Sequence, residues 1–182
     1  MASSPMVFGV YPVQSSTSRR LKLRAWLPVL ACALVFAVES TSYLGADHTS
    51  APLERAAEAI FGYGVGMHWG MIHILLRKAG HFMGYGAFCL VCFRGFWIEF
   101  QSEASKLSRQ LRAHGLAIAV TFLVASADEI HQSFLPNRCG QFSDVLLDTL
   151  GGVALGLVVF MAMQARSAAS CRREAACAEA AA

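Results

Sequence analysis

The sequence predicts an all-α, polytopic membrane protein: a four-helix transmembrane bundle with short interfacial helices between the first and second spans. Two observations predict this class. Hydrophobic residues make up 55% of the 182 residues and charged residues only 15%, whereas about a quarter of a typical soluble domain is charged. The hydrophobic residues also gather in long runs separated by polar segments. The length allows one domain.

The first span is expected at residues 25–38, directly after a basic cluster: Arg19, Arg20, Lys22 and Arg24. A basic flank and a short apolar core are also typical of a secretory signal peptide. No small-x-small cleavage pattern follows the run, so a retained span is the better interpretation. We interpret residues 1–20 as a disordered N-terminal tail and residues 21–164 as the transmembrane domain.

The segment between the first two spans is polar, then mixed. Pro52 indicates a helix start, because proline is tolerated in the first turn, and residues 53–60 are expected to form a short amphipathic helix that ends at Gly62. Residues 67–76 are apolar, but two histidines interrupt them and they are too short to span. We expect them to lie on the membrane interface or dip into it; a fifth span is the alternative.

The other three spans are expected at residues 79–97, 115–134 and 142–163. A polar connector at residues 101–114 separates the second span from the third. The third and fourth spans are joined by a short segment with the turn residues Pro136, Asn137 and Gly140, which should fold the two helices antiparallel. Residues 165–182 are expected to form an Ala-rich cytoplasmic tail.

The distribution of Lys and Arg predicts the orientation. The N-terminal arm, the 101–114 connector and the C-terminal tail hold most of the basic residues, and such segments stay in the cytoplasm. Four spans satisfy this arrangement with both termini inside. The start of the second span, the end of the third and the start of the fourth then lie at the outer face.

Ionisable groups are costly in hydrocarbon and rarely persist there without a partner or a role. At the three outer helix ends the candidate site residues are Lys78, His81, Tyr85, Asp128, Glu129, Gln132, Arg138, Asp144 and Asp148. Asp144 and Asp148 lie one helical turn apart and share a face. We expect this acidic face to look at that of the preceding helix, with Arg138 between them.

A structural role is the alternative for these residues. Polar groups can lock membrane helices together, but packing does not require four carboxylates with an imidazole and a guanidinium. Lys78 and Arg138 are expected to contact a phosphate, while Arg77 is as well explained by anchoring at headgroups. Three other histidines are interpreted as interfacial residues without a function: His68, His73 and His131.

Other features carry less chemistry. The six cysteines have no metal-binding or disulfide spacing, and Cys89-x-x-Cys92 is interpreted as two small packing residues in an apolar helix. The formal net charge of +3 gives no indication of a nucleic-acid partner. The expected partners are membrane lipids, including a lipid-linked headgroup, and the sequence does not define an oligomeric state.

The order of these motifs resembles the VanZ-like family of small bacterial membrane proteins. The residues that carry the resemblance are Arg77-Lys78-Ala79-Gly80-His81-Phe82, Tyr85, Asp128-Glu129-Ile130-His131-Gln132, Pro136-Asn137-Arg138, Asp144, Asp148 and Gly151-Gly152. The resemblance covers residues 25–160, although Asn137 stands where the family commonly has glycine. It implies a four- or five-helix domain in the cytoplasmic membrane. One member is associated with teicoplanin resistance, which implies no reaction for this chain.

Two functions remain open. In the first, the protein is an enzyme that acts on a lipid-linked headgroup at the outer leaflet: Asp128 or Glu129 is the general base, His81 the acid, and a divalent metal held by the acids is an alternative. In the second, the same cluster binds an envelope lipid or glycolipid without turnover and modulates the cell surface. A transporter is a weaker alternative, because the chain has no visible repeat.

Overall fold

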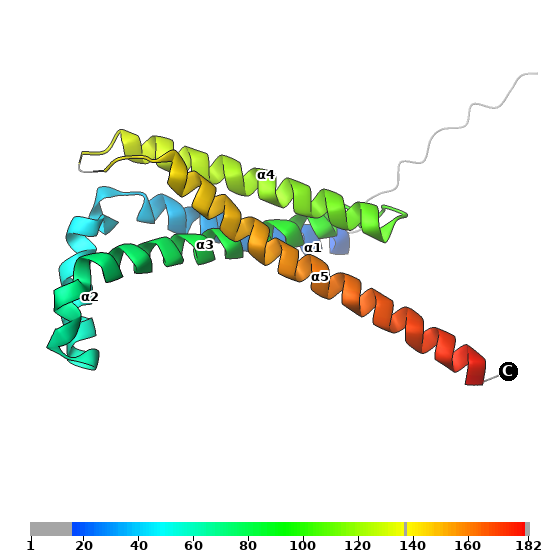
Figure 1. The fold of residues 1–182 in the computed structure, drawn as a ribbon. Coiled ribbons are helices and arrows are strands. Elements are labelled where there is room, and N and C mark those ends of the chain that lie inside the picture. The colour runs from blue at the N-terminus through cyan, green and yellow to red at the C-terminus, as the bar shows by residue number, and fades with distance from the viewer. Residues whose placement is uncertain (1–15, 137, 181–182) are drawn as a thin grey trace, which may run out of the picture.

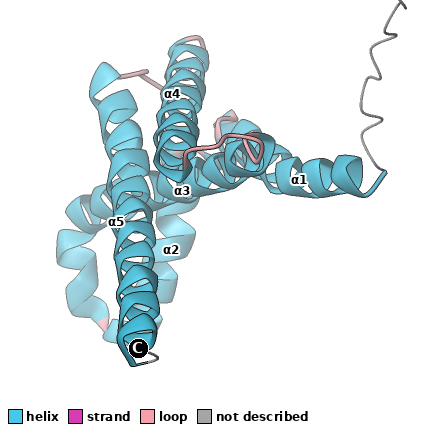
Figure 2. Cartoon of the chain, turned by 90° about the vertical axis from the view of Figure 1, so that its right-hand side faces the viewer, coloured by secondary structure: helices cyan, strands magenta, loops and turns pink. Residues whose placement is uncertain are grey.

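The computed structural model describes residues 16–136 and 138–180, and within these ranges it contains helices and connecting loops but no strand (Figures 1 and 2). The long helices are α1 (Ser16–Glu39), α2 (Ala46–Phe61), α3 (Trp69–Glu99), α4 (Lys106–Ser133) and α5 (Phe142–Ala180). Two short 3-10 helices, η1 (Ser42–Leu44) and η2 (Tyr63–His68), flank α2. The all-α prediction is therefore confirmed.

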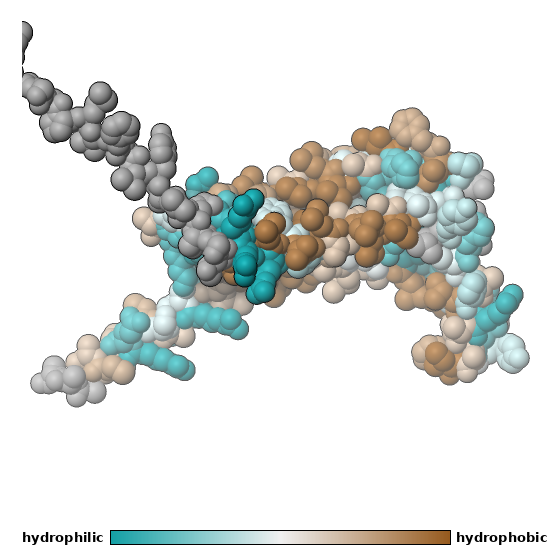
Figure 3. Space-filling model, turned by 180° about the vertical axis from the view of Figure 1, so that it is seen from behind, coloured by the Kyte–Doolittle hydropathy of each residue, from teal (hydrophilic) through white to brown (hydrophobic). Residues whose placement is uncertain are grey.

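Three of the described helices are long and apolar enough to cross a membrane: Arg19–Glu39 within α1, Lys106–Ser133, and Phe142–Glu179 within α5. They contain the predicted spans at residues 25–38 and 142–163, and all but the last residue of the span at 115–134. Many of their large hydrophobic side chains are exposed, among them Leu27, Leu34, Leu123 and Leu157. Hydrophobic residues cover the middle of the face in Figure 3, and hydrophilic residues gather toward its two ends. This surface fits a lipid environment.

The structure differs from the sequence prediction at three helix starts. Residues 69–76 are the first turns of α3 and not a separate interfacial segment, because no proline lies between residues 69 and 79 and Arg77-Lys78 favours a continuous helix. Helix α4 begins at Lys106, inside the predicted 101–114 connector, since Ser105 caps it by accepting a hydrogen bond from Ser108 N at 3.3 Å. Helix α2 begins at Ala46, so Pro52 lies inside it.

Two predicted features lie wholly or partly outside the described residues. Most of the predicted N-terminal tail, residues 1–15, belongs there, and α1 already begins at Ser16. Asn137 of the predicted turn also lies outside them. The rest of the connector does join α4 to α5 as a short loop, and the two helices pack together. At the other end of the chain, α5 continues well past residue 165, and its end projects from the bundle (Figure 1).

Helix α3 packs against α1, α4 and α5 and thus lies at the centre of the bundle. Helices α3 and α5 run in the same direction, with α4 running back between their ends (Figure 1). The beginning of α3, the end of α4 and the beginning of α5 therefore meet at one end. At the opposite end, Lys22 Nζ and Glu99 Oε1 form an ion pair of 2.7 Å between α1 and α3.

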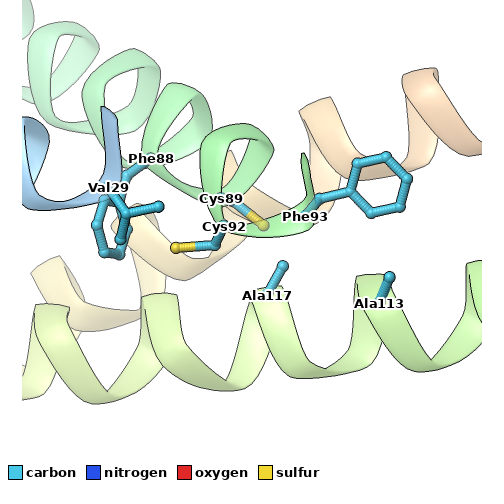
Figure 4. Close-up of a cluster of buried hydrophobic side chains, with 7 residues drawn as sticks. All are labelled: Val29, Phe88, Cys89, Cys92, Phe93, Ala113 and Ala117. Atoms are coloured by element: carbon cyan, nitrogen blue, oxygen red, sulfur yellow. The ribbon is translucent and has the colours of Figure 1, made fainter. Parts of the chain in front are cut away.

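Small residues let these helices approach closely, as is usual in membranes. Cys89 and Cys92 are buried beside Ala113 and Ala117 of α4 (Figure 4), which agrees with the packing role predicted for the two cysteines. A Cβ atom added to Gly151 would overlap the carbonyl oxygen of Phe82. The beginning of α5 is therefore held directly against the backbone of α3.

Candidate functional site

His81 and Asp148 connect α3 to α5 at the end of the bundle where three helix ends meet. His81 Nδ1 lies 3.4 Å from Asp148 Oδ2, and the side chain of Asp148 is fully buried. Because an ionised carboxylate only accepts hydrogen bonds, it orients the imidazole with Nδ1–H toward itself and leaves Nε2 for another partner. Asp148 Oδ1 is also buried and has no hydrogen-bond partner among the described residues.

Tyr85 and Asp128 make the corresponding connection between α3 and α4. The Tyr85 hydroxyl donates to Asp128 Oδ2 at 3.0 Å. The Tyr85 ring is 1% exposed and stacks on Phe36 of α1, with ring centroids 4.3 Å apart. A third helix thus fixes the phenol that holds the carboxylate.

Asp144 and Glu129 are the other two carboxylates of the predicted site. Lys78 Nζ and Asp144 Oδ1 form an ion pair of 2.9 Å between partly exposed side chains. Glu129 is buried, and its Oε2 accepts a hydrogen bond of 2.8 Å from the backbone N–H of Gln141 in the α4–α5 loop. A Cβ atom on Gly140 would overlap the carbonyl oxygen of Glu129, so glycine allows the loop to reach this side chain.

A pocket of about 160 Å³ opens between these helix ends. Its polar lining is formed by His73, Arg77, Lys78, His81, Glu129, Gln132 and Asp144. Five of the nine residues predicted from the sequence therefore face one space. Asp148 lies behind His81, while Asp128 and its partner Tyr85 do not line the pocket. The pocket has room for a few waters, at about 30 Å³ each, or for a group the size of a phosphate.

A model of the VanZ/LLP1 family matches residues 6–164, and this match spans every residue of the pocket. The chain belongs to the VanZ/LLP1 family. No curated protein and no solved structure matches the chain. Membership of the VanZ/LLP1 family, together with the three apolar helices, makes it a multi-pass membrane protein.

The sequence of this VanZ/LLP1 domain indicated that Arg138 lies between the two acidic faces. In the structure, Arg138 instead contacts the chain at the end of α1. Its Nη2 donates to the carbonyl oxygens of Glu39 at 3.1 Å and Thr41 at 3.0 Å. The Glu39 carbonyl lies in the last turn of α1, which leaves acceptors without partners, and Thr41 lies two residues beyond that helix. Arg138 therefore ties the α4–α5 loop to α1.

We expect Arg138→Ala to loosen this junction. Loss of the two hydrogen bonds should lower the free energy of unfolding by about 1 kcal/mol, since the side chain is only partly buried. Amide hydrogen exchange at residues 39–45 should rise relative to wild type. Arg173→Ala, in the exposed end of α5, is the control. If Arg138→Ala leaves amide hydrogen exchange at residues 39–45 unchanged but weakens binding of a lipid phosphate, Arg138 binds the ligand and does not tie the loop to α1.

The sequence prediction missed one residue of the VanZ/LLP1 pocket, His73, and left the role of another, Arg77, open. His73 is 5% exposed and stacks on Trp69 at 5.7 Å, so it is not a surface histidine. Arg77 lines the same pocket. His73, Arg77, His81 and Tyr85 recur every four residues, which is the spacing of one helix face. This signal was lost because the sequence prediction ended the segment at residue 76.

The sequence left open a divalent metal held by the acidic residues, and the described part of the chain does not bring such ligands together. Among the described residues, no group of three or more His, Cys, Asp or Glu side chains is arranged to hold a metal ion. The carboxylates instead separate into pairs with His81, Tyr85 and Lys78.

Proposed function

We propose that this VanZ/LLP1 protein is an enzyme that acts on a phosphate-bearing, lipid-linked headgroup at the outer face of the cytoplasmic membrane. The observation that carries the proposal is the His81–Asp148 pair: a fully buried carboxylate oriented on an imidazole that lines a polar pocket. Buried carboxylates at membrane depth are costly and by default indicate a functional site. A His–carboxylate pair is a common device for proton transfer.

The proposed topology has four spans, with α3 as the fourth beside the three apolar helices. Polar and charged side chains such as His81 and Arg94 interrupt its apolar sequence, but its contacts with α1, α4 and α5 place it inside the bundle. Basic residues at the start of α1, the start of α4 and the end of α5 favour a cytoplasmic location for that end. Both termini are then cytoplasmic, and the pocket opens outward.

In the same topology, α2 and η2 lie at the outer interface as the short interfacial helices. Both carry large exposed side chains that fit the headgroup region: Ile60, Phe61, Tyr63 and Met67. A helix with an apolar face and exposed aromatic residues is typical of such a position.

Each pocket residue has a proposed role in the reaction. Lys78 and Arg77 bind the phosphate oxygens. Glu129 accepts a proton from the water that attacks phosphorus, and His81, protonated on both ring nitrogens, gives its Nε2 proton to the departing ester oxygen. One water is consumed and one phosphoester bond is broken. Asp148 is a positioning residue, since it holds the imidazole through Nδ1.

Comparison of lipid extracts from cells with and without the protein tests this function. We expect one phosphate-bearing lipid class to accumulate without it, and to return to its normal level with wild type but not with His81→Ala or Glu129→Gln. Glu99→Gln, which removes a carboxylate from the ion pair with Lys22 at the opposite end, should restore it fully. If all variants bind the lipid and no extract ever changes, the protein is a non-enzymatic binder and the proposal is wrong.

A further inference from the structure

A second cavity adjoins the polar pocket and is not explained by the proposed reaction. It is a groove of about 540 Å³ between α1, the beginning of α2 and the first half of α3. This volume lies within the range of about 300–1,000 Å³ that is usual for ligand pockets. Most of its wall is apolar, and Cys32, Val35 and Phe36 of α1 form one side.

Small residues on α3 leave the groove open. Gly80, Gly84 and Ala87 lie along its wall. A Cβ atom on Gly80 would meet no heavy atom of the described residues within 4 Å, and one on Gly84 would reach only Phe36, at 3.6 Å. The space is therefore available to another molecule.

The groove leads directly into the polar pocket. His73, Arg77 and His81 line both cavities, and Glu39 and Thr49 also line the groove. The polar part of the groove wall therefore holds three basic residues and one acid, while the rest of its wall is mainly apolar. From His73 to Ala87 the wall extends roughly 20 Å along α3 at 1.5 Å per residue. One leaflet of hydrocarbon is about 15 Å deep. The groove is therefore long enough to hold a lipid chain over the full depth of one leaflet.

We propose that this groove holds a hydrocarbon chain of the substrate lipid, with the lipid's phosphate at His73, Arg77 and His81. This inference rests on the proposed function and deepens it, because it defines the substrate as a membrane lipid phosphate that stays in the bilayer. A lipid phosphate matches both parts of the cavity, since its anionic end meets the basic residues and its chain meets the apolar wall. A water-soluble phosphate would leave the groove empty.

Photocrosslinking of the full-length protein in phosphatidylcholine nanodiscs tests the proposal. The probe is phosphatidic acid with a diazirine in the middle of one acyl chain, and mass spectrometry maps the labelled residues. We expect labels on groove residues of α1 and α3. Gly80→Leu should reduce this labelling by about tenfold, because the added side chain occupies the chain's space. Gly70→Leu is the matched control: it lies on the same helix, outside the groove and in open space, and should label like wild type.

Two further measurements separate the possible outcomes. Diacylglycerol with the same labelled chain should label the groove much less than phosphatidic acid does, because it has no phosphate. Equal labelling by the two probes, or labelling of Gly80→Leu at the wild-type level, would overturn the proposal. Glu129→Gln should keep the groove labelling, since it changes the reaction and not the chain site. A lipid change in cells without groove labelling would refute this inference and leave the proposed function standing.

Discussion

Asp148→Asn should reduce turnover of the headgroup by about 100- to 10,000-fold, the range of general acid–base catalysis. An amide can present N–H to His81 Nδ1 and favour the wrong tautomer, and it cannot stabilise a charged imidazole. Bound lipid should change little, because Asp148 lies behind His81 and does not line the pocket. Turnover and lipid binding are measured on the same nanodisc preparation.

The control for this prediction must separate catalysis from stability. Glu99→Gln makes the same carboxylate-to-amide change in an ion pair at the other end of the bundle and should keep full turnover. Thermal unfolding shows whether Asp148→Asn is folded. A folded variant with wild-type turnover would remove Asp148 from the mechanism.

Tyr85→Phe is expected to have the second largest effect, on stability. It removes the donor to Asp128 Oδ2 and leaves a carboxylate with neither oxygen paired, since Oδ1 has no partner among the described residues. The free energy of unfolding should fall by about 2 kcal/mol, as for a partly buried charged acceptor that loses its donor. Tyr63→Phe, at an exposed tyrosine, should be neutral.

A double-mutant cycle assigns this cost to the pair. Tyr85→Phe should cost much less in a chain that already carries Asp128→Leu, with a coupling energy of about 1–3 kcal/mol. Denaturant unfolding in detergent provides the four free energies. Additive effects of the two substitutions would mean that Tyr85 contributes through its contact with Phe36 and not through Asp128.

The sequence predicted the arrangement of the helices well where local signals agree. The turn residues before Phe142 define the start of α5, and the separation of basic ends from acidic ends predicted that the start of α3, the end of α4 and the start of α5 meet. The sequence also predicted five residues that line the polar pocket: Lys78, His81, Glu129, Gln132 and Asp144. Their roles remain predictions.

Features that depend on distant contacts were beyond the sequence. Arg138 binds the end of α1, far away in the chain, and no local pattern indicates that partner. The continuity of α3 was hidden because residues 67–76 are short and contain histidines, so His73 was assigned to the interface. Predicting the groove requires knowing how α1 packs against α3, and the spacing of residues in the sequence does not show this.

The most direct test of the central claim is crosslinking between α3 and α5 in intact cells. Lys78→Cys and Asp144→Cys are combined in a chain whose exposed native cysteines are alanine, and a short bifunctional maleimide is added. Mass spectrometry should find the 78–144 crosslink, and pretreatment with a membrane-impermeant maleimide should prevent it. The pair Lys22→Cys and Glu99→Cys should crosslink equally with and without the pretreatment. The account is contradicted if the 78–144 crosslink does not form, or if the impermeant maleimide prevents the 22–99 crosslink and not the 78–144 crosslink. Either result would mean that the acids and the basic residues do not form one outward pocket.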